Sequence, residues 1–523
     1  MSAAETPSLS ALAGDSSATP RVTLRNYFPH AYDSAIAAAR TCYATRLITP
    51  DEISEKQRIS IGPATFNGGH HTVYQHAHFE FGLENVSRQF VWNFLHSHPF
   101  YNSEQQSQRY VRLDRAQAFL PPLIGEARAV YAQAIERAWE RYRELSAKLI
   151  PRTRETLYQV WKIGPNTDDK RRRRIEAQVE KKAIEVARYV LPLAAHTTLV
   201  HTVSGIVLHR MSRMRHSGDT PHETALVIDQ MVARVKEVDP EFFDRVGSVP
   251  LEESRIPETR LAVSADPRRS RNEFDAALGG RTSKVISIDA NAERVAAQAV
   301  RYVLGLSESE MDDDCALDEL LNPARNRYRL ETMNVSMHSP MMRALEHVHY
   351  TFQKKISHTA DSQDQRHRMV PASRPLLAAT DCPEPDYLTP MLVRGNAEAE
   401  LLYSQAMEEA WAAKNKLLAL GVPKEFAVYV LPNATAIRLV ESGSLLHLLH
   451  KWTMRTCFNA QEEIYFASME ELEQIRAAHP RLMRYVGPPC VVRKGNAYPV
   501  CTEGSHFCGV KVWENFPNAQ RLL

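Results

Sequence analysis

The chain has 523 residues, 44% of them hydrophobic and 24% charged, an ordinary globular composition with enough length for about two to four domains. Its 64 Lys and Arg residues against 62 Asp and Glu leave a net charge of only +2, so the overall charge does not require a nucleic-acid or membrane partner, and any anion site must be local. No apolar run approaches the roughly 18 residues of a membrane helix, and residues 1–20 are unlike a secretory signal, so we expect a cytoplasmic enzyme.

Each half of the chain is predicted to begin with a strand and a helix. Residues 1–21 are rich in Ser, Ala and Pro and are expected to form a disordered tail. A strand at 22–24 and a helix at 34–40 follow, and the same order returns at 284–288 and 292–302. Alternation predicts further strands at 78–81 and 349–352. The three-to-four spacing of apolar residues predicts helices at 127–149, 172–190, 397–420 and 445–454.

These elements indicate an α+β fold, helix-rich, with one modest sheet in each of two diverged copies of a single domain. The first copy is assigned to residues 22–250 and the second to residues 284–475. Residues 251–283 contain Pro and Gly residues and several charges, and are expected to link the copies. Residues 476–523 form a Cys-containing C-terminal segment.

The duplication is predicted from two repeated blocks. Residues 76–81 (HAHFEF) recur as 347–352 (HVHYTF), and the same shift of 271 places His96 on His367. Residues 185–192 (EVARYVLP) recur as 425–432 (EFAVYVLP), and the shift of 240 also places Arg215 on Arg455 and Glu223 on Glu463. Repeats this long that occur twice indicate a duplicated domain rather than a solenoid, whose units are shorter and more numerous.

Two polar stretches are candidates for anion binding. Residues 102–110 (NSEQQSQRY) offer a hydroxyl, amides and the guanidinium of Arg109, which suit a phosphate; the alternative is an ordinary loop. Arg366 and Arg368 flank His367 within one predicted helical turn, and this positive charge suits a phosphate or an electron-rich ring; the alternative is a surface helix turn.

Single arginines in the helical blocks are a third candidate. Arg188 lies beside the apolar residues 189–192 and is expected to be partly buried, and a buried guanidinium needs an anion. Arg215 and Arg455 occupy equivalent positions in the two copies. Because Glu185 and Glu223 are available as structural partners, both a carboxylate and a ligand remain open as the anion.

A basic run at residues 170–174 precedes a predicted helix. It has no interleaved aromatic residues on which bases could stack, so a solvated helix start is favoured over a nucleic-acid contact.

The order and spacing of these motifs resemble the flavin-dependent thymidylate synthases twice over. In the first copy the resemblance rests on residues 70–76 (HHTVYQH), 87–88 (SR), 104–110 and 185–192. In the second copy it rests on Gln363, residues 366–368 (RHR), 430–432 (VLP) and 460–464 (AQEEI). The similarity covers about residues 22–250 and 284–475.

The resemblance implies an enzyme that methylates dUMP to dTMP. Methylenetetrahydrofolate supplies the carbon, reduced FAD the hydride, and NADPH reduces the flavin, at sites shared between the subunits of a homotetramer. Arg366, His367 and Arg368 are implied to bind FAD. Arg215 and Arg455 are the implied catalytic residues, and the nucleotide role falls to Ser107, Gln108, Arg109, Arg188, Arg215, Gln363 and Arg455.

Each copy departs from the family pattern in a different place. The sequence Arg366-His367-Arg368 is called the triplet below. The first copy lacks both of its arginines, with Leu95 and Ser97 at the aligned positions. The second copy lacks the Ser-x-Arg-Tyr loop and has Val428 where the first has Arg188. We therefore expect the first copy to supply the nucleotide half and the second the flavin half of a shared site. A homodimer would then imitate the tetramer.

The cysteines outside the resemblance suggest a metal site. Cys490, Cys501, His506 and Cys508 are a candidate tetrahedral zinc set, although their spacing lacks the two-residue knuckle of common zinc motifs. The alternative is reduced thiols in a closing segment. The four other cysteines, expected as buried reduced thiols, are Cys42, Cys315, Cys382 and Cys457.

Two other functions remain open at this stage. One is a non-catalytic protein that binds flavin or nucleotide; the other is flavin- and folate-dependent methylation of a different uracil-containing acceptor, including RNA bound through residues 170–174. The complementary losses in the two copies favour the enzyme, with dUMP and folate as its small-molecule partners and no membrane partner.

Overall fold

The two halves of the chain fold into separate sheets of identical topology. The computed structural model describes residues 19–109, 111–113, 115–247, 249–262 and 264–523, so most of the expected tail, and Tyr110 of the polar loop, lie outside the described residues. Within them, one antiparallel sheet has the strand order β1-β2-β4-β3 and the other the order β5-β6-β8-β7. The expected α+β fold with two copies of one domain is confirmed.

The first sheet consists of β1 (Arg21–Tyr27), β2 (His78–Ser87), β4 (His196–Ser204) and β3 (Asn102–Gln105). Alternate residues of β2, namely Phe79, Phe81 and Leu83, are fully buried. They pack in one hydrophobic cluster with residues of α1 (Ala31–Thr41), α6 (Gly205–Arg213) and α7 (Pro221–Val238). A sheet that is covered on one face gives this alternation of apolar and polar residues.

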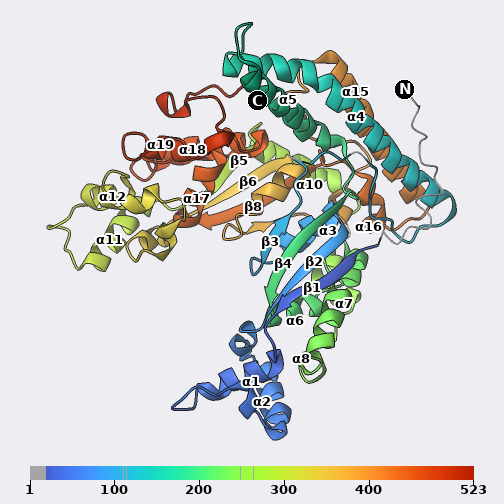
Figure 1. Ribbon diagram of the computed structural model, residues 1–523, viewed down its shortest axis with the longest axis vertical. Helices are drawn as coiled ribbons and strands as arrows, with labels where there is room; N and C mark the ends of the chain where they lie inside the picture. The colour runs from blue at the N-terminus through green and yellow to red at the C-terminus, as the bar shows by residue number, and fades with distance from the viewer. Residues whose placement is uncertain (1–18, 110, 114, 248, 263) are drawn as a thin grey trace.

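The second sheet repeats this arrangement with β5 (Ser283–Ile288), β6 (His349–Ser357), β8 (Ala436–Ser444) and the two-residue β7 (Ala372–Ser373). Its core is formed with α11 (Ala292–Leu304), α12 (Asp313–Leu321), α17 (Leu445–Arg455) and α18 (Glu462–Ala478). Figure 1 shows α1 and α2 (Glu55–Asn67) extending from the first copy and α11 and α12 from the second, in two different directions.

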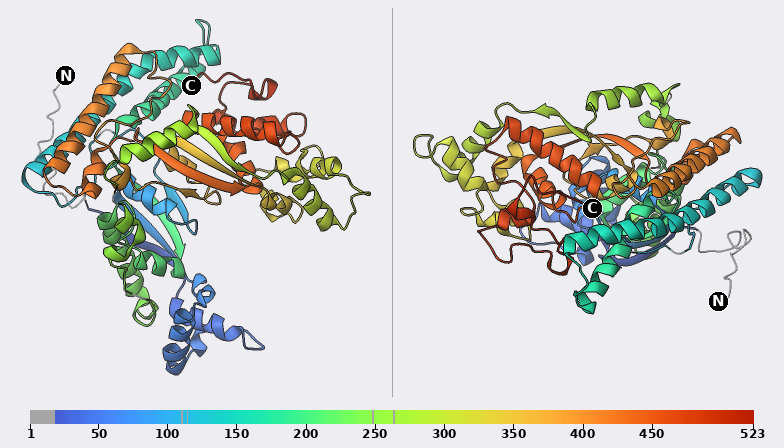
Figure 2. Two further views of the ribbon diagram at one scale, coloured as in Figure 1. Left: turned by 180° about the vertical axis from the view of Figure 1, so that it is seen from behind. Right: turned by 90° about the horizontal axis from the view of Figure 1, so that it is seen from above.

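A third core joins the copies. The long helix α4 (Gly125–Trp161) and α5 (Asp169–Ala187) of the first copy pack with α15 (Ala397–Ala419) of the second, as Figures 1 and 2 show. Arg137 and Arg141 of α4 both donate hydrogen bonds to Glu409 of α15. The two copies are therefore fastened by a large shared apolar layer, and their relative position is fixed by packing rather than by the connecting segment.

The connecting segment is itself partly helical. It contains α9 (Pro257–Leu261) and α10 (Pro267–Leu278), and Asp275 of α10 accepts hydrogen bonds from Lys355 and Arg438 of the second sheet. The division into domains at residues 251–283 remains a prediction.

The basic run forms the first turns of α5 and makes contacts within the chain. Arg171 donates to the carbonyl of Trp161 and Arg174 to that of Ser505.

Two of the cysteines expected to be buried, Cys42 and Cys315, are exposed. Among the described residues, no helix is long and apolar enough to cross a membrane.

A β-bulge makes the first copy one residue longer than the second before the triplet. The register of β2 against β4 shifts between Leu83 and Val86, where Asn85 adopts a left-handed conformation with φ of 57°. The pairing of β6 with β8 has no such shift. The bulge therefore inserts one residue that has no counterpart in the second copy.

This insertion changes the residue equivalences. Ser87 pairs with His196, and Ser357 pairs with Ala436, the residue 240 positions after His196. Ser87 thus corresponds to Ser357, and the shift beyond the bulge is 270 instead of 271. The alignment of Leu95 and Ser97 with the two arginines was wrong: the residues opposite Arg366, His367 and Arg368 are His96, Ser97 and His98.

A buried histidine in the first sheet gives a prediction on pH. The ring of His201 in β4 lies against Phe94 and Tyr101, and neither ring nitrogen has a hydrogen-bond partner among the described residues. Burial, with a smaller effect of His98, lowers the pKa of His201 to about 3. The ring therefore stays neutral in the folded protein at pH values where the unfolded chain takes up a proton.

We expect His201→Phe to reduce the loss of stability on acidification. Because the folded-state pKa is depressed, the contribution of neutral His201 is fully present above pH 6.5 and is lost as the pH falls toward 3. At pH 5 the loss amounts to at most about 2 kcal/mol. Urea unfolding at pH 7 and pH 5 measures it, and an unchanged difference between the two pH values in the variant would contradict the expectation.

Candidate active site

The two copies meet at an exchange of backbone hydrogen bonds with approximate two-fold symmetry. Leu193 N donates to Leu431 O at 2.8 Å, and Asn433 N donates to Leu191 O at 2.8 Å. The donors and acceptors are related by the shift of 240 residues. Such an isologous contact is the geometry of a symmetric dimer, formed here within one chain.

Two buried tyrosines cross this junction. Tyr189 donates a hydrogen bond to Glu463 of the second copy, and Tyr429 donates to Glu223 of the first at 2.6 Å. Each glutamate also accepts from the serine that begins the helix after the central strand, Ser87 or Ser357. The repeated motifs around residues 189 and 429 therefore position the helices that follow β2 and β6.

On one side of the junction the polar loop of the first copy reaches the second copy. Arg109 donates from Nε to Glu185 at 2.6 Å and from Nη2 to the carbonyl of Asn459 at 2.9 Å. The Ser107 hydroxyl accepts from Arg109 N at 3.2 Å. Gln108 is buried, and its Oε1 accepts from Nδ2 of Asn433 at 3.2 Å.

The triplet of the second copy reaches back to the same loop. It follows α13 (His358–Asp364), and Arg366 donates to the carbonyl of Ser103 and lies 3.4 Å from the Glu104 carboxylate. The Arg368 guanidinium lies over the ring of Tyr101, 5.1 Å from its centre. Burial, together with Arg455 and Lys451, lowers the pKa of His367 to about 2, so its ring is neutral.

Gln461, at the start of α18, connects the remaining predicted residues. Its Oε1 accepts from Arg188 Nη2 at 3.3 Å and from Gln363 Nε2. Arg455, at the end of α17, donates to the Gln363 carbonyl at 2.8 Å. Arg109, Arg188, Arg366 and Arg455, with the loop 459–461, are called the arginine site below.

The guanidinium groups of the arginine site are buried close to one another, with Glu185 and Asp364 opposing their mutual repulsion. Burial is the main cause that lowers the pKa of Arg188 and Arg455, and the neighbouring Arg109 lowers both further. Arg88 behaves in the same way, with a pKa lowered to about 9 by burial and by Arg188. Guanidinium groups that are buried beside one another are stabilised when an anion binds between them.

Behind the triplet lies a fully buried network of charges. Lys451 Nζ donates to Asp364 at 2.8 Å and to Glu441 at 2.6 Å, and Lys354 Nζ contacts Asp364, Glu441 and Glu471 at 3.2, 2.7 and 2.8 Å. Asp364 is the last residue of α13, and Lys451 lies on α17. The network therefore fixes the two helix ends that carry Arg366 and Arg455.

The described residues of the first copy contain no such network at the equivalent positions. Its residues at the equivalent positions of the sheet and helices are Leu83, Phe94, His201, Met211 and Met231, which are apolar except for the neutral His201. The same fold is therefore built without these charges, and the charges belong to the half that carries the triplet.

The pseudo-symmetric counterpart of the arginine site lacks the equivalents of Arg109, Arg188 and Arg366. The isolated bridges Ala118–Ala195 and Tyr387–Thr435 give a shift of 269 for the loop, so Gln108 and Arg109 correspond to Leu377 and Ala378. Val428 replaces Arg188. The triplet position holds His96, Ser97 and His98.

An internal carboxylate occupies this counterpart. Asp219 is buried and accepts hydrogen bonds from Leu377 N at 2.8 Å and Ala378 N at 3.1 Å. Burial raises the pKa of Asp219 to about 7, and these two N–H groups oppose the rise. Its equivalent at the arginine site is the neutral Asn459. The backbone N–H groups of the counterpart loop are therefore satisfied from within the protein.

Arg215 does not join the arginine site. It follows α6 at the position equivalent to Arg455 and pairs with Asp229 on the first copy. Among the described residues, none of its recorded hydrogen bonds or ion pairs reaches the other predicted site residues. The structure thus brings together Gln108, Arg109, Arg188, Gln363, Arg366 and Arg455 and leaves Arg215 outside.

Sequence reasoning did not assign several residues that the structure places at the site. Arg88 and Gln461 stood within the matched motifs without a role. Arg521 had no sequence signal: it comes from the C-terminal segment, is buried, and donates from Nη2 to the Ala460 carbonyl at 2.6 Å. Its Nη1 has no hydrogen-bond partner among the described residues.

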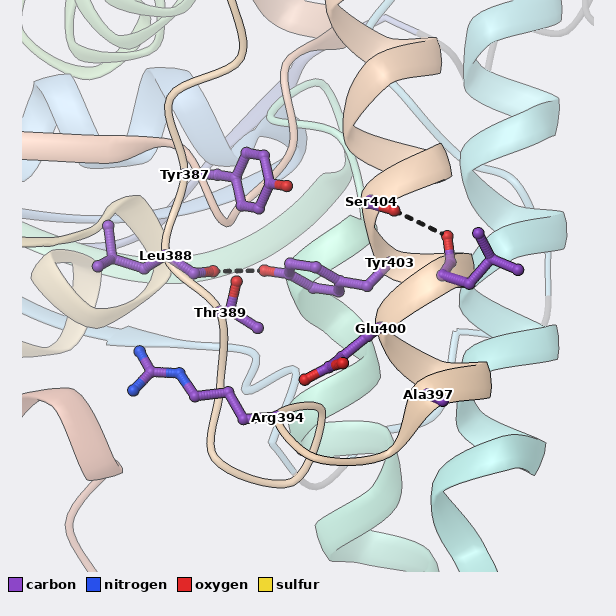
Figure 3. A pocket seen from close by; sticks show the side chains of 9 residues that line it. Tyr387, Leu388, Thr389, Arg394, Ala397, Glu400, Tyr403 and Ser404 are labelled. Carbon is purple, nitrogen blue, oxygen red and sulfur yellow. Dashed lines mark hydrogen bonds between the residues drawn. The ribbon is translucent and has the colours of Figure 1, made fainter.

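A cavity of about 620 Å³ lies apart from these residues. Figure 3 shows it between α15 and the segment before it, with Tyr387, Arg394 and Glu400 on its walls. Tyr403 closes one side by donating to the Leu388 carbonyl at 2.5 Å. None of the predicted site residues lines it.

The expected zinc set is not gathered as predicted. In the described part of the chain, no group of three or more His, Cys, Asp and Glu side chains is in position to hold a metal ion. His506 is exposed, whereas Cys490, Cys501 and Cys508 line a small cavity together with Cys457.

Comparison with known proteins places both copies in one family. The sequence model of the family described as thymidylate synthase complementing protein matches residues 23–241 and 284–481. A flavin-dependent thymidylate synthase of Clostridium tetani is 29% identical over 232 residues, which are 43% of this chain and 86% of that protein. One of Sulfurisphaera tokodaii is 35% identical over 152 residues, which are 29% of this chain and 59% of that protein.

A solved structure with detectable similarity is a UMP/dUMP methylase, PolB, of Streptomyces cacaoi bound with 5-Br dUMP. It is 18% identical, with a TM-score of 0.32, and the match covers 44% of this chain and 98% of that one. Since the family model matches most of the chain and does so once in each copy, the protein belongs to the thymidylate synthase complementing protein family, that of the flavin-dependent thymidylate synthases.

Proposed function

We propose that the protein is an FAD-dependent thymidylate synthase that methylates dUMP at one site per chain, the arginine site. The observation that carries the proposal is the convergence of Arg109 and Arg188 from one copy with Arg366 and Arg455 from the other. The counterpart has lost three of these four arginines, its remaining Arg215 pairs with Asp229, and Asp219 occupies its loop. The losses in the two copies are complementary because both affect the counterpart, so that the arginine site keeps its groups.

The donors at the arginine site fit a phosphorylated ligand. Four buried nitrogen atoms lack a hydrogen-bond partner among the described residues: the donors Arg188 Nε, Arg455 Nε and Gln108 Nε2, and the ring nitrogen His367 Nε2. Buried donors without partners cost about 1–3 kcal/mol each, so a ligand with several acceptor oxygens recovers that energy. A nucleotide phosphate provides such oxygens, and paired guanidinium groups bind it in two-pronged fashion.

The residues also fit FAD. Arg366 and Arg368, after α13, offer positive charge to a pyrophosphate or to an electron-rich ring, and the neutral His367 lies between them. When bound, FAD in its reduced form supplies the hydride that completes the methyl group. NADPH as reductant and methylenetetrahydrofolate as carbon donor are part of the proposal.

The chain's own residues bind and orient the nucleotide in this scheme. Arg109 and Arg188 hold the phosphate, and Gln108 and Gln363 orient the rest of the nucleotide through their amides. Arg455 lies between the two halves and is the proposed residue that faces the uracil, whose C5 loses a proton as the methyl group is added. We propose a homodimer of the chain as the assembly that imitates the family's tetramer.

Growth of a thymidine-requiring cell tests the proposed function. Expression of the intact chain is expected to restore growth without thymidine. A protein that only binds flavin or nucleotide, or that methylates another uracil-containing acceptor, fails to restore it.

Arg455→Ala and Arg215→Ala form a matched pair within this test. The two arginines are equivalent in the fold, but only Arg455 contacts the arginine site. We expect Arg455→Ala to weaken dUMP binding by about 10-fold or more, the effect of about 1.5–3 kcal/mol for a hydrogen bond to a charged group. Arg215→Ala should leave it within about twofold. Calorimetric titration with dUMP measures both, and equal effects would contradict a single site.

A further inference from the structure

Four of the seven cysteines converge on one cavity at the edge of the arginine site. Cys457 follows α17, and Cys490, Cys501 and Cys508 come from the C-terminal segment beyond the family match. All four line an enclosed cavity of about 10 Å³, together with Asn459 and Glu503. All four are free thiols.

The segment that supplies three of these thiols has little core of its own. Its regular structure is limited to α19 (Pro489–Arg493) and two short 3₁₀ turns, at Gly504–His506 and Val512–Glu514. From Pro489 to Leu523, which the structure describes in full, the only buried hydrophobic residues are Cys490, Val492 and Val512. Segments with so small a core are usually fastened by a disulfide or a metal ion.

The same segment contacts the loop of the arginine site. Asn459, whose carbonyl accepts from Arg109, donates from Nδ2 to Glu503 at 3.0 Å and to the His506 carbonyl at 2.7 Å. Arg521 donates to the carbonyl of Ala460. A link between Cys457 and the C-terminal segment therefore bears directly on the position of residues 459–461.

We propose that Cys457, Cys490, Cys501 and Cys508 bind one structural Zn²⁺ ion, which fastens the C-terminal segment to the loop of the arginine site. The set differs from the one expected from spacing, because Cys457, distant in sequence, takes the place of His506. Four thiolates in tetrahedral arrangement are a common ligand set of structural zinc.

The cavity limits which occupant fits. About 10 Å³ is close to the room needed by a single water-sized atom, which accommodates one metal ion but not an iron–sulfur cluster. No group of three or more His, Cys, Asp and Glu side chains in the described residues is already in position to hold an ion, so the proposal requires the thiols to move inward across this cavity. The four thiols release four protons, and the four thiolates then coordinate Zn²⁺.

Metal analysis of the purified full chain, produced with zinc in the medium, tests the proposal. We expect about one zinc per chain, retained on gel filtration. Cys490→Ser and Cys501→Ser should lose most of it, whereas Cys42→Ser and Cys315→Ser, which alter exposed thiols outside the cavity, should retain it. Cys501→His offers a nitrogen ligand in place of sulfur and should retain zinc where Cys501→Ser does not.

Cobalt substitution and proteolysis give readouts that do not depend on activity or on dUMP. Protein loaded with Co²⁺ should show thiolate-to-cobalt charge transfer, and removal of the metal should expose residues 489–523 to protease. Absence of stoichiometric zinc, zinc retained in both serine variants, iron with labile sulfide, or two disulfides in place of four thiols would each overturn the proposal.

Discussion

Lys451→Met is expected to destabilise the protein by about 3–5 kcal/mol, the cost of leaving buried charge without its partner. Lys451 is fully buried and donates to Asp364 and Glu441, which are also fully buried. Without this ammonium group, Lys354 is left in contact with the three carboxylates of Asp364, Glu441 and Glu471. Urea unfolding measures the change in free energy, and a loss below about 1 kcal/mol would contradict the burial of a charged pair.

The first copy provides the matched control. A variant with Lys354→Leu, Asp364→Phe, Glu441→His and Lys451→Met adopts the residues of the first copy and removes two positive and two negative charges together. Glu471, the fifth member of the network, loses its ion pair with Lys354 but keeps its hydrogen bonds from Ser283 and Trp452. Replacing a buried ion network with apolar residues is often neutral or stabilising, so we expect this variant to be more stable than Lys451→Met alone.

The same four-residue variant should lose bound FAD although it folds. Asp364 ends α13, and its contact with Lys451 fixes the position of Arg366 and His367. If the variant is stable and retains FAD, the network has no part in positioning the triplet.

Arg366→Ala is expected to weaken FAD binding by about 10- to 150-fold, the effect of about 1.5–3 kcal/mol for a hydrogen bond to a charged group. Arg366 contacts the Ser103 carbonyl and the Glu104 carboxylate of the other copy, so it also aligns the polar loop with the triplet. The flavin absorbance of the purified protein, followed by titration of FAD, measures the loss.

His96→Ala is the control for this prediction. His96 occupies the position of Arg366 in the first copy, and burial lowers its pKa to about 3, so it carries no charge near neutral pH. We expect FAD to bind this variant as it binds the wild type. Equal loss of flavin in both variants would indicate that each copy holds an FAD and that the single-site proposal is wrong.

The fold with two copies could be predicted from the sequence because each copy repeats the same local patterns. Alternation at residues 78–81 and 349–352 and the helical spacing in the second half of each copy depend on neighbouring residues alone. The repeated block around Tyr189 and Tyr429 was evident from the sequence, but its place at the junction and its contacts with Glu463 and Glu223 required the folded chain.

Local sequence patterns could not predict which residues of the first copy correspond to the triplet. A β-bulge at Asn85 adds one residue without disturbing the apolar pattern, so a constant shift placed the wrong residues opposite the two arginines. Arg521 and Cys457 likewise gave no signal, because their partners are far away in sequence.

By itself, the sequence determined the family, the two copies and the residue types of the site, since these are properties of order and spacing. The tertiary structure decided which residues act together. Packing of the copies around the junction brings Arg109 and Arg366 to one side and leaves Arg215 with Asp229 on the other. It also brings four distant thiols to one cavity. Long-range contacts of this kind follow from how the helices and sheets pack, which no local pattern contains.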